Sequence, residues 1–333
     1  MKAVFLTNSN EPLITKEVPT PEPADNEVLI KLEYSSLNHR DVFIQRGRYA
    51  GIKEGLILGS DGCGKVAATG KKADSSLVGK TVVINASHNW GNNPKAFGAD
   101  FKILGNPDNG TFAEYIVVDK QYVYPKPNHL SDAEAAALPL AGLTTYRAVF
   151  TRAKIEKGEK VLITGIGAGT ALLALQYALV AGGEVYVTSG SEDKINKAIA
   201  MGASAGANYK DEEWTKKLQQ QSGGFDVVLD SASGKNFVQL LQVTIPGGRV
   251  VFWGGTDGPI SNIIPRDIFW KNISILGTTM GTIKEFEQML AFTETHNIKP
   301  VIDKIFPSLE HAQEAFEYMA EGKQFGKIVL RNV

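Results

Sequence analysis

Apolar and polar positions alternate with a period of two over much of the first 120 residues. Short runs of this kind, separated by Pro, Gly and Asn clusters, cover Val28–Tyr34, Thr81–Ile84 and Thr111–Val118. Such alternation is typical of half-buried β-strands. The pattern predicts a β-rich domain over residues 1–120.

From Ser131 the pattern becomes helical, and strand-like apolar runs then alternate with helical segments as far as about residue 296. Ser131 and Glu134 have the spacing of a capping box, which predicts that a helix begins there. The strand candidates are Lys160–Thr164, Glu184–Thr188, Gly206–Tyr209, Asp226–Asp230, Arg249–Trp253 and Asn272–Gly277. This alternation predicts an α/β Rossmann domain with a doubly wound parallel sheet over residues 121–296.

After His296 the chain holds a strand candidate, Val301–Phe306, an amphipathic helix, Ser308–Ala320, and a last strand, Lys327–Arg331. This tail is short for a domain of its own. We expect residues 297–333 to rejoin the first β-rich domain, which makes the Rossmann domain an insertion.

The segment 159–171 predicts a dinucleotide site. An apolar run (Val161–Ile163) meets a glycine-rich turn, and a helical apolar pattern (Ala171–Val180) follows. Glycines let a backbone approach a pyrophosphate, and the free N–H groups of the helix N-terminus hold its charge. A second strand candidate completes a βαβ unit of about 30 residues, although tight turns also use glycine for backbone reasons alone. The expected phosphate contacts are Gly167, Ala168, Gly169 and Thr170.

Composition and charge exclude several classes of protein. The 333 residues are 43% hydrophobic and 21% charged, with a net charge of −1, so no strong field attracts nucleic acid or an anionic membrane. The longest helical apolar stretch is too short to span a bilayer, and a single cysteine excludes internal disulfides and cysteine-rich metal sites. We expect a cytoplasmic enzyme without nucleic-acid or membrane partners.

Several short segments are specific in their order and spacing. They are Leu37–Asp41, the Gly47–Tyr49 turn, Leu58–Gly64, Gly110–Tyr115, Ala141–Tyr146, Gly202–Tyr209 and Gly326–Leu330. With them, nearly the whole chain resembles the medium-chain dehydrogenase/reductase superfamily, specifically its zinc-free quinone-oxidoreductase-like branch. The resemblance implies a GroES-like catalytic domain for the β-rich part, a nicotinamide cofactor and a homodimer formed through the edge of Asn272–Gly277.

The positions aligned with zinc ligands hold no normal ligand. Zinc-dependent members of the superfamily place Cys and His side chains where this chain has Asn38, Ser60 and Ala141, and a glutamate where it has Asp61. An amide, a hydroxyl and a methyl group are not normal zinc ligands. The long segment 85–109 also lacks the four cysteines of a structural zinc lobe. We therefore expect no metal.

Other residues that suggest a metal or a pocket have ordinary interpretations. We expect His39 and His88 to lie in loops and Cys63 to pack as a small apolar residue. Trp90 and Phe97, in the long segment, are candidates for lining an aromatic-tolerant pocket.

The end of the second Rossmann strand favours NADPH over NADH. NAD-binding versions of this fold end the strand with an acidic residue, whereas here it ends Thr188–Ser191 with no carboxylate until Glu192. The resemblance implies a 2′-phosphate pocket made of Ser189, Lys194 and Tyr209. In the alternative interpretation Ser191 caps the next helix, Lys194 is solvated and Tyr209 packs in the fold. Other implied cofactor contacts are Thr145, Ser231, Trp253, Gly254 and Thr278.

Without zinc, the negative charge that develops on the substrate oxygen needs hydrogen-bond donors. The amide of Asn38 is the first candidate, Tyr49 the second, as donor or proton relay, and Arg40 the third. We expect NADPH-dependent reduction of quinones or α,β-unsaturated carbonyl compounds. Aldehyde or alcohol conversion with either cofactor, and a regulatory or structural NADPH-binding protein without turnover, are the alternatives.

Overall fold

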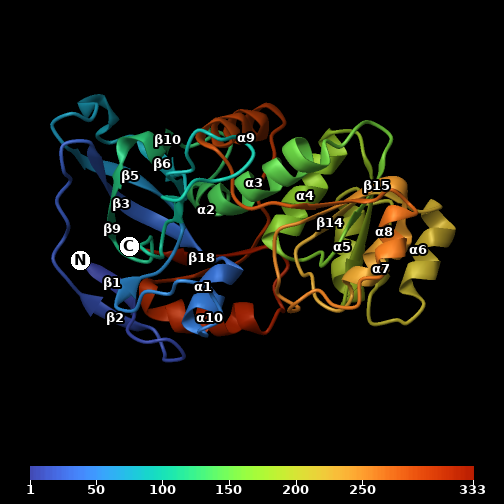
Figure 1. The fold of residues 1–333 in the computed structure, drawn as a ribbon. Helices are drawn as coiled ribbons and strands as arrows, with labels where there is room; N and C mark the ends of the chain where they lie inside the picture. Colours follow the sequence, from blue (N-terminus) through green and yellow to red (C-terminus); the bar gives the residue numbers. More distant parts are fainter. The chain divides into compact units, whose positions relative to one another are not determined.

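The structure, a computed structural model, describes residues 1–333 and divides into two compact units. The first unit comprises Met1–Leu143 and Gly281–Val333, and the second comprises Thr144–Met280. Colour along the chain shows the same division, since blue and red segments share the first unit (Figure 1). The Rossmann-type domain is therefore inserted into the β-rich domain, as expected from the sequence.

The first unit is built on a mixed sheet with the order β10-β6-β5-β3-β18-β17, in which β9 also pairs with β3. Its strands are β3 (Glu27–Ser36), β5 (Asp61–Thr69), β6 (Thr81–Ile84), β9 (Tyr115–Asp119), β10 (Val123–Pro125), β17 (Ile302–Phe306) and β18 (Lys327–Arg331). The last strand, β18, runs antiparallel to β3, and Val329 pairs with Ser36. The expectation that the C-terminal tail rejoins the first domain is therefore confirmed.

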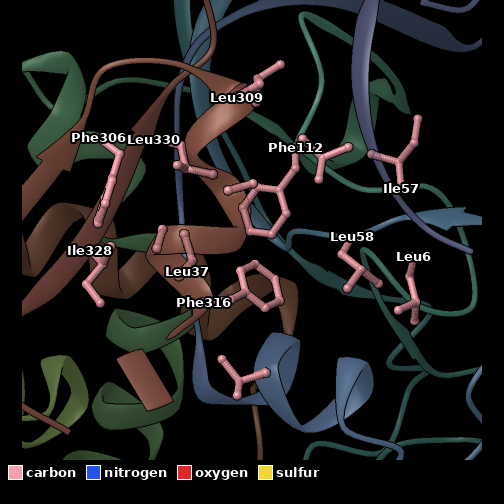
Figure 2. Packing of buried hydrophobic residues seen from close by; sticks show 14 of the residues in the cluster. Leu6, Leu37, Ile57, Leu58, Phe112, Phe306, Leu309, Phe316, Ile328 and Leu330 are labelled. Carbon is pink, nitrogen blue, oxygen red and sulfur yellow. The ribbon is translucent and has the colours of Figure 1, made fainter. Parts of the chain in front are cut away.

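Smaller elements complete the first unit. They are β1 (Lys2–Leu6), β2 (Ile14–Glu17), β4 (Leu56–Ile57), β7 (Ser87–His88), β8 (Lys102–Ile103), α1 (His39–Gln45), α2 (Asp132–Ala136), α9 (Ile283–Thr295), α10 (Ala312–Ala320) and the 3₁₀ turns Ser75–Leu77, Lys120–Tyr122 and Leu309–His311. A helix, α3 (Pro139–Tyr146), crosses the boundary between the units. Leu37, Phe112, Phe316 and Leu330 pack in a fully buried cluster, which fixes the end of β3 and the start of α1 (Figure 2).

The unit boundaries differ from those expected from the sequence. Residues 121–143 and 281–296 belong to the first unit and not to the Rossmann domain. The reason is pairing: β10 joins the first sheet through β6, and Phe286 of α9 packs on Tyr124 with ring centroids 5.0 Å apart. A helical pattern alone does not say on which sheet a helix packs.

The second unit is a parallel sheet with the order β13-β12-β11-β14-β15-β16. Its strands are β11 (Lys160–Ile163), β12 (Glu184–Ser189), β13 (Ala205–Asn208), β14 (Phe225–Asp230), β15 (Thr244–Phe252) and β16 (Ser274–Gly277). The helices are α4 (Gly169–Val180), α5 (Glu192–Ala200), α6 (Trp214–Ser222), α7 (Phe237–Val243), α8 (Pro265–Phe269) and a π-helical segment, Arg147–Ala153. The predicted doubly wound sheet is confirmed.

The strand order reverses between β11 and β14. From β11 the chain first adds β12 and β13 on one side, and later β14, β15 and β16 on the other. Residues Val161–Ile163 of β11 are fully buried, as expected for a strand covered on both faces. Ligands of doubly wound sheets bind beyond the carboxyl ends of the strands at such a reversal.

The long segment 85–109 is not purely irregular. Its β7 and β8 form a short antiparallel hairpin, in which Ser87 pairs with Ile103. The ring of Trp90 packs against Phe97 and Phe101, with centroids 5.9 and 5.4 Å away. These aromatics therefore form a small cluster with one another. None of the helices is long and apolar enough to cross a membrane.

Candidate functional site

The turn between β11 and α4 is built on glycines. Gly165 and Gly167 have φ values of 62° and 125°, in the left-handed region that favours glycine. The N–H of Ile166 donates to the Thr188 carbonyl (2.8 Å), which ties the turn to the end of β12. The N-cap of α4 is Ala168, and no side chain caps the helix. The N–H groups of the first turn are therefore available for an anion.

The expected cofactor residues that follow β14, β15 and β16 lie at the same edge of the sheet. The Trp253 N–H donates to the Asp230 carbonyl (3.2 Å), and the Thr278 N–H to the Phe252 carbonyl (3.0 Å). The Ser231 hydroxyl lies 3.9 Å from the point where a Cβ on Gly165 would stand. Ser231, Gly254 and the glycine turn therefore share one end of the reversal.

A buried carboxyl group, which the sequence analysis missed, organises these strand ends. Asp230 accepts hydrogen bonds from the Thr164 hydroxyl and from the Ser233 N–H (2.7 Å). The Ser233 hydroxyl in turn donates to the Gly254 carbonyl (2.6 Å). Burial raises the pKa of Asp230 above its usual value, although these hydrogen bonds oppose the shift. The signal in the sequence was an Asp that closes an otherwise apolar strand.

The proposed 2′-phosphate residues come from three successive elements. Ser189 pairs with Asn208 across β12 and β13, and the Tyr209 N–H donates to the Ser189 carbonyl (3.1 Å). Lys194 lies in the first turn of α5, directly after this loop. A Cβ on Gly190 would stand 2.8 Å from the Tyr209 hydroxyl and 2.9 Å from Cε of Lys210. Lys210, which the sequence did not single out, therefore lies close to Gly190 together with Tyr209.

Thr145 is buried beneath the glycine turn. Its hydroxyl donates to the Thr170 carbonyl (3.3 Å) in the first turn of α4. This contact positions the start of the helix, and the role of Thr145 toward a cofactor stays a prediction.

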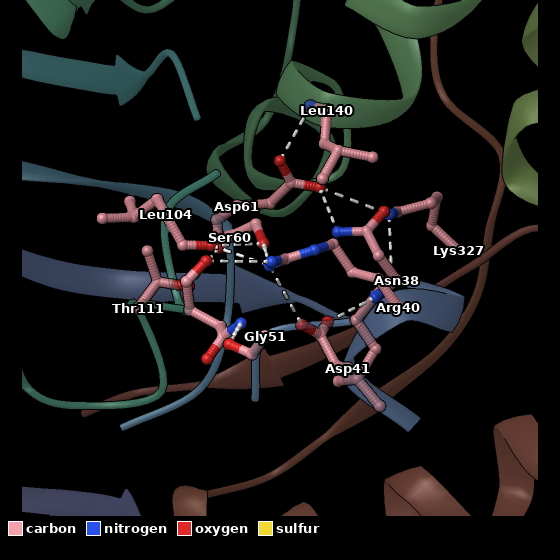
Figure 3. Close-up of polar contacts among 12 residues, drawn as sticks. Asn38, Arg40, Asp41, Gly51, Ser60, Asp61, Leu104, Thr111, Leu140 and Lys327 are labelled. Atoms are coloured by element: carbon pink, nitrogen blue, oxygen red, sulfur yellow. Dashed lines mark hydrogen bonds and ion pairs between the residues drawn. The ribbon is translucent and has the colours of Figure 1, made fainter. Parts of the chain in front are cut away.

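In the first unit, Asn38 lies at the centre of a buried polar cluster (Figure 3). Its Oδ1 accepts a hydrogen bond from Nζ of Lys327 (2.7 Å), and its Nδ2 donates to Oδ2 of Asp61 (2.9 Å). Its backbone N–H donates to Oδ2 of Asp41 (2.8 Å) in the first turn of α1. Because Asn38 directly precedes that helix and follows the buried Leu37, its position is fixed on both sides.

Lys327 is the member of the cluster that the sequence analysis missed. Its side chain is 5% exposed, and Nζ donates to the Leu37 carbonyl (2.8 Å) and to Asn38 Oδ1, with Asp61 Oδ2 at 3.4 Å. Burial lowers the pKa of Lys327, while Asp61 and then Asp41 oppose the shift. The signal was a lysine that begins an apolar strand, but nothing in the sequence showed that it meets Asn38.

Arg40 is held by several acceptors of its own unit. Its Nη1 donates to the Ser60 hydroxyl (2.6 Å) and to the Leu104 carbonyl (2.9 Å), and its Nη2 to the Asn106 carbonyl (3.3 Å). The guanidinium also lies over the Tyr49 ring, 5.1 Å from its centroid. Arg40 and Tyr49 are therefore neighbours, and Arg40 is engaged in structural contacts. Their expected roles toward a substrate stay predictions.

Two carboxyl groups lie in this cluster. Oδ1 of Asp61 accepts from the Leu140 N–H (2.8 Å). Asp41 is fully buried, and its Oδ1 has no hydrogen-bond partner, with Arg40 Nη1 4.0 Å away. Burial raises the pKa of Asp41 to about 6, although Arg40 opposes the shift. By accepting from the Asn38 N–H, Asp41 stabilises the start of α1.

The comparisons with known proteins cover both units. Residues 24–128 match the family described as "Alcohol dehydrogenase GroES-like domain", and residues 169–295 match "Zinc-binding dehydrogenase". A "Zinc-type alcohol dehydrogenase-like protein YogA" from Leptosphaeria maculans is 36% identical over 96% of this chain and 94% of its own length. The quinone oxidoreductase of Mus musculus is 30% identical over 99% of this chain and 97% of its own length.

The fold agrees with these sequence matches. A crystal structure titled as an NAD-dependent alcohol dehydrogenase superposes with a TM-score of 0.95 and 33% identity, covering 100% of both chains. The chain belongs to the medium-chain dehydrogenase/reductase superfamily. It is an oxidoreductase of this superfamily, with a GroES-like domain and a Rossmann domain for a nicotinamide cofactor.

The positions that the resemblance aligns with zinc ligands have other surroundings in this structure. Asn38 and Ser60 each accept a hydrogen bond from a buried cation, Lys327 and Arg40 respectively. Ala141 offers only a methyl group, and no group of three His, Cys, Asp or Glu side chains is arranged to hold a metal ion. These residues do not fit zinc, because the two cations would repel a divalent ion.

The other side chains that suggested a metal have structural surroundings. His39 begins α1 and His88 lies in β7, so the expectation that both lie in loops was wrong. The strand at His88 was too short to show a pattern in the sequence. Cys63 is fully buried in β5, as expected for a small packing residue.

Proposed function

We propose that this protein reduces quinones or α,β-unsaturated carbonyl compounds by hydride transfer from NADPH without zinc. The observation that carries the proposal is the hydrogen-bonded cluster of Asn38, Asp61 and Lys327, in which Asn38 stands at a position that the resemblance aligns with a zinc ligand. It presents a hydrogen-bond donor supported by a buried cation, where zinc-dependent relatives bind a Lewis acid. A substrate oxygen that gains negative charge needs such a donor.

The second unit fits a dinucleotide. The two glycines with positive φ and the uncapped N-terminus of α4 form a cradle that accepts a pyrophosphate. In the proposal this cradle is formed by Gly167, Ala168, Gly169 and Thr170. Ser231, Trp253, Gly254 and Thr278 line the strand ends beyond it.

The preference for NADPH rests on the end of β12. This strand ends at Ser189, and Gly190 and Ser191 follow it before α5. No carboxylate stands where one would accept from a ribose 2′-hydroxyl and repel a 2′-phosphate. Ser189 and Tyr209 supply hydroxyl groups, and Lys194 supplies a cation, for a 2′-phosphate.

When bound, the nicotinamide supplies the hydride. The overall reaction is quinone + NADPH + H⁺ → hydroquinone + NADP⁺. Nδ2 of Asn38 donates to the substrate oxygen, so that the negative charge formed on it as the hydride arrives is stabilised. The oxygen then takes a proton from solvent or through Tyr49. Because a hydroquinone anion is a weak base, this last step needs no dedicated acid.

A second candidate is the interconversion of aldehydes and alcohols with NAD(H) or NADP(H). It is supported by the alcohol-dehydrogenase names of the relatives, including the NAD-dependent enzyme with a TM-score of 0.95. An alkoxide is a much stronger base than a hydroquinone anion, so this reaction needs a firm proton donor. Tyr49, beside Arg40, is the available residue.

The two candidates are separated by following the absorbance of the reduced nicotinamide. We expect rapid NADPH loss with phenanthrenequinone and with enones, little with simple aldehydes, and no effect of chelators. Turnover of aldehydes alone, or loss of activity on zinc removal, would favour the second candidate. NADPH binding without turnover of any acceptor would favour the remaining alternative, a regulatory or structural NADPH-binding protein.

The cofactor preference has its own test. Lys194→Ala should raise the KM for NADPH by about tenfold, because it removes one charge-assisted contact worth about 1.4 kcal/mol. The use of NADH should stay nearly unchanged. An equal loss with both cofactors would contradict the pocket. The proposal also includes a homodimer and a cytoplasmic setting. The one cysteine, Cys63, is free and buried, which agrees with a reducing compartment.

A further inference from the structure

The amide of Asn38 is held in one orientation by two groups of opposite charge. The ammonium of Lys327 can only donate hydrogen bonds, and the carboxylate of Asp61 can only accept them. Oδ1 of Asn38 must therefore face Lys327 (2.7 Å), and Nδ2 must face Asp61 (2.9 Å). A flip of the amide would place donor against donor and acceptor against acceptor.

We propose that Lys327 is a positioning residue that orients and polarises the Asn38 carboxamide, so that a fixed organic cation takes over part of the role that zinc has in relatives. This inference rests on the proposed function, in which Asn38 holds the substrate oxygen. The strength of the hydrogen bond from Asn38 to the substrate then depends on Lys327, which is 289 positions away in the sequence.

Lys327 acts through Asn38 because its own donors are already used. Nζ has three N–H groups, and three acceptors surround it: the Leu37 carbonyl, Asn38 Oδ1 and Asp61 Oδ2. No N–H remains for a substrate. Nδ2 of Asn38 has two hydrogens, of which one goes to Asp61, so the second is the donor left for a substrate oxygen.

A cation on Oδ1 strengthens that donor. Hydrogen bonds in a chain polarise one another, and the effect is larger where water is excluded. Lys327 is 5% exposed and Asp61 is fully buried, so solvent screens this chain little. As the hydride arrives and the substrate oxygen becomes negative, the N–H of Asn38 is drawn toward it while Lys327 stabilises the charge moved onto Oδ1.

The test is a double-mutant cycle on kcat for NADPH-dependent quinone reduction by the full chain. Asn38→Ala should lower kcat by about 100-fold, as for loss of an oxyanion donor. Lys327→Met, which keeps an unbranched side chain only one atom shorter, should lower it by about 10–100-fold, with the KM for NADPH unchanged within about twofold. In the Asn38→Ala background, Lys327→Met should have almost no further effect.

A second variant separates catalysis from folding. Lys327→Met alone leaves Asp61 buried without its cation and is expected to lower Tm. The double variant Asp61→Asn with Lys327→Met removes both charges and should recover most of the lost Tm. Its kcat should nevertheless stay low, because no cation polarises Asn38.

Three results would overturn the inference. They are an unchanged kcat for Lys327→Met, independent effects of Lys327 and Asn38, and recovery of kcat together with Tm in the neutral double variant. If the unsubstituted enzyme reduces quinones, any of these three results would overturn the role of Lys327 but not the proposed function. Absence of turnover by the unsubstituted enzyme with every carbonyl acceptor would remove both.

Discussion

Gly190 shows how one missing side chain shapes the proposed 2′-phosphate pocket. A Cβ there would stand 2.8 Å from the Tyr209 hydroxyl and 2.9 Å from Cε of Lys210, both at the ends of flexible side chains. Gly190→Ala should therefore fold but displace these groups and raise the Kd for NADPH by about tenfold, or about 1.4 kcal/mol. Binding of both cofactors, followed by fluorescence titration, checks this, and NADH should lose much less affinity.

His88 predicts a specific loss of stability in acid. It stacks on Tyr122 with ring centroids 3.9 Å apart, and burial lowers the pKa of His88 to about 4, with a nearby Lys102 adding to the shift. His88 of the unfolded chain is therefore protonated at a higher pH than His88 of the folded protein. The contribution of His88 to stability is lost as the pH falls from about 6.5 toward 4. The loss by pH 5 is about 2 kcal/mol.

The variant His88→Phe keeps the stacked ring and removes the titrating group. Its free energy of unfolding, measured with denaturant, should fall by about 2 kcal/mol less between pH 7 and pH 5 than that of the unsubstituted protein. If both proteins lose the same stability over this range, His88 is not the group responsible.

At the scale of single residues, the sequence predicted candidates but not their partners. Asn38 could be named because it occupies a position defined by a family resemblance. Lys327 could not, since its contact with Asn38 depends on β18 pairing with β3, and such long-range pairing has no local signal. Lys210 was missed for the same reason: only the folded turn brings it beside Gly190.

Among the elements, α2 has the most explicit start signal. The Ser131 N–H donates to Glu134 Oε2 (2.7 Å), and the Glu134 N–H donates to the Ser131 hydroxyl (3.3 Å), so the predicted capping box is confirmed. Ser131→Ala should lower the free energy of unfolding by about 1 kcal/mol. Ser204→Ala, at an exposed serine whose hydroxyl makes none of the hydrogen bonds of the structure, is the matched control. Equal stability of the two variants would contradict the cap.

Element boundaries were predictable where apolar runs are continuous and failed where turn residues interrupt them. β6 and β18 have the predicted bounds, Thr81–Ile84 and Lys327–Arg331. β15 begins at Thr244, five residues before the predicted Arg249, because Pro246 and two glycines conceal a strand that passes through a register shift.

For the whole molecule, the edge of the second sheet supports the proposed dimer. β16 pairs only with β15, and the nearby Ile264, Phe269 and Trp270 are 56%, 64% and 73% exposed. Apolar side chains of this size beside an open strand edge are typical of an interface. We expect Trp270→Asp to shift the dimer to monomer in sedimentation experiments. Phe97→Asp, at an exposed aromatic of the first unit, should not.

A monomeric unsubstituted protein, or a dimer that Trp270→Asp does not dissociate, would contradict this interface.

The fold class and the insertion were predictable because both follow from the order of strand-like and helical patterns along the chain. The unit boundaries were not, since they depend on which sheet α9 and β10 join.

The pairing of β18 with β3 also determines when, during synthesis of the chain, Asn38 can meet Lys327. Asn38 is made before the inserted unit, but Lys327 and Asn332, whose amide donates to the Ser35 hydroxyl (2.9 Å), are made after it. The inserted Rossmann unit is complete long before its host and can fold first, as domains generally do during translation. A nascent chain would therefore form the proposed nucleotide cradle while the proposed site around Asn38 is still without Lys327.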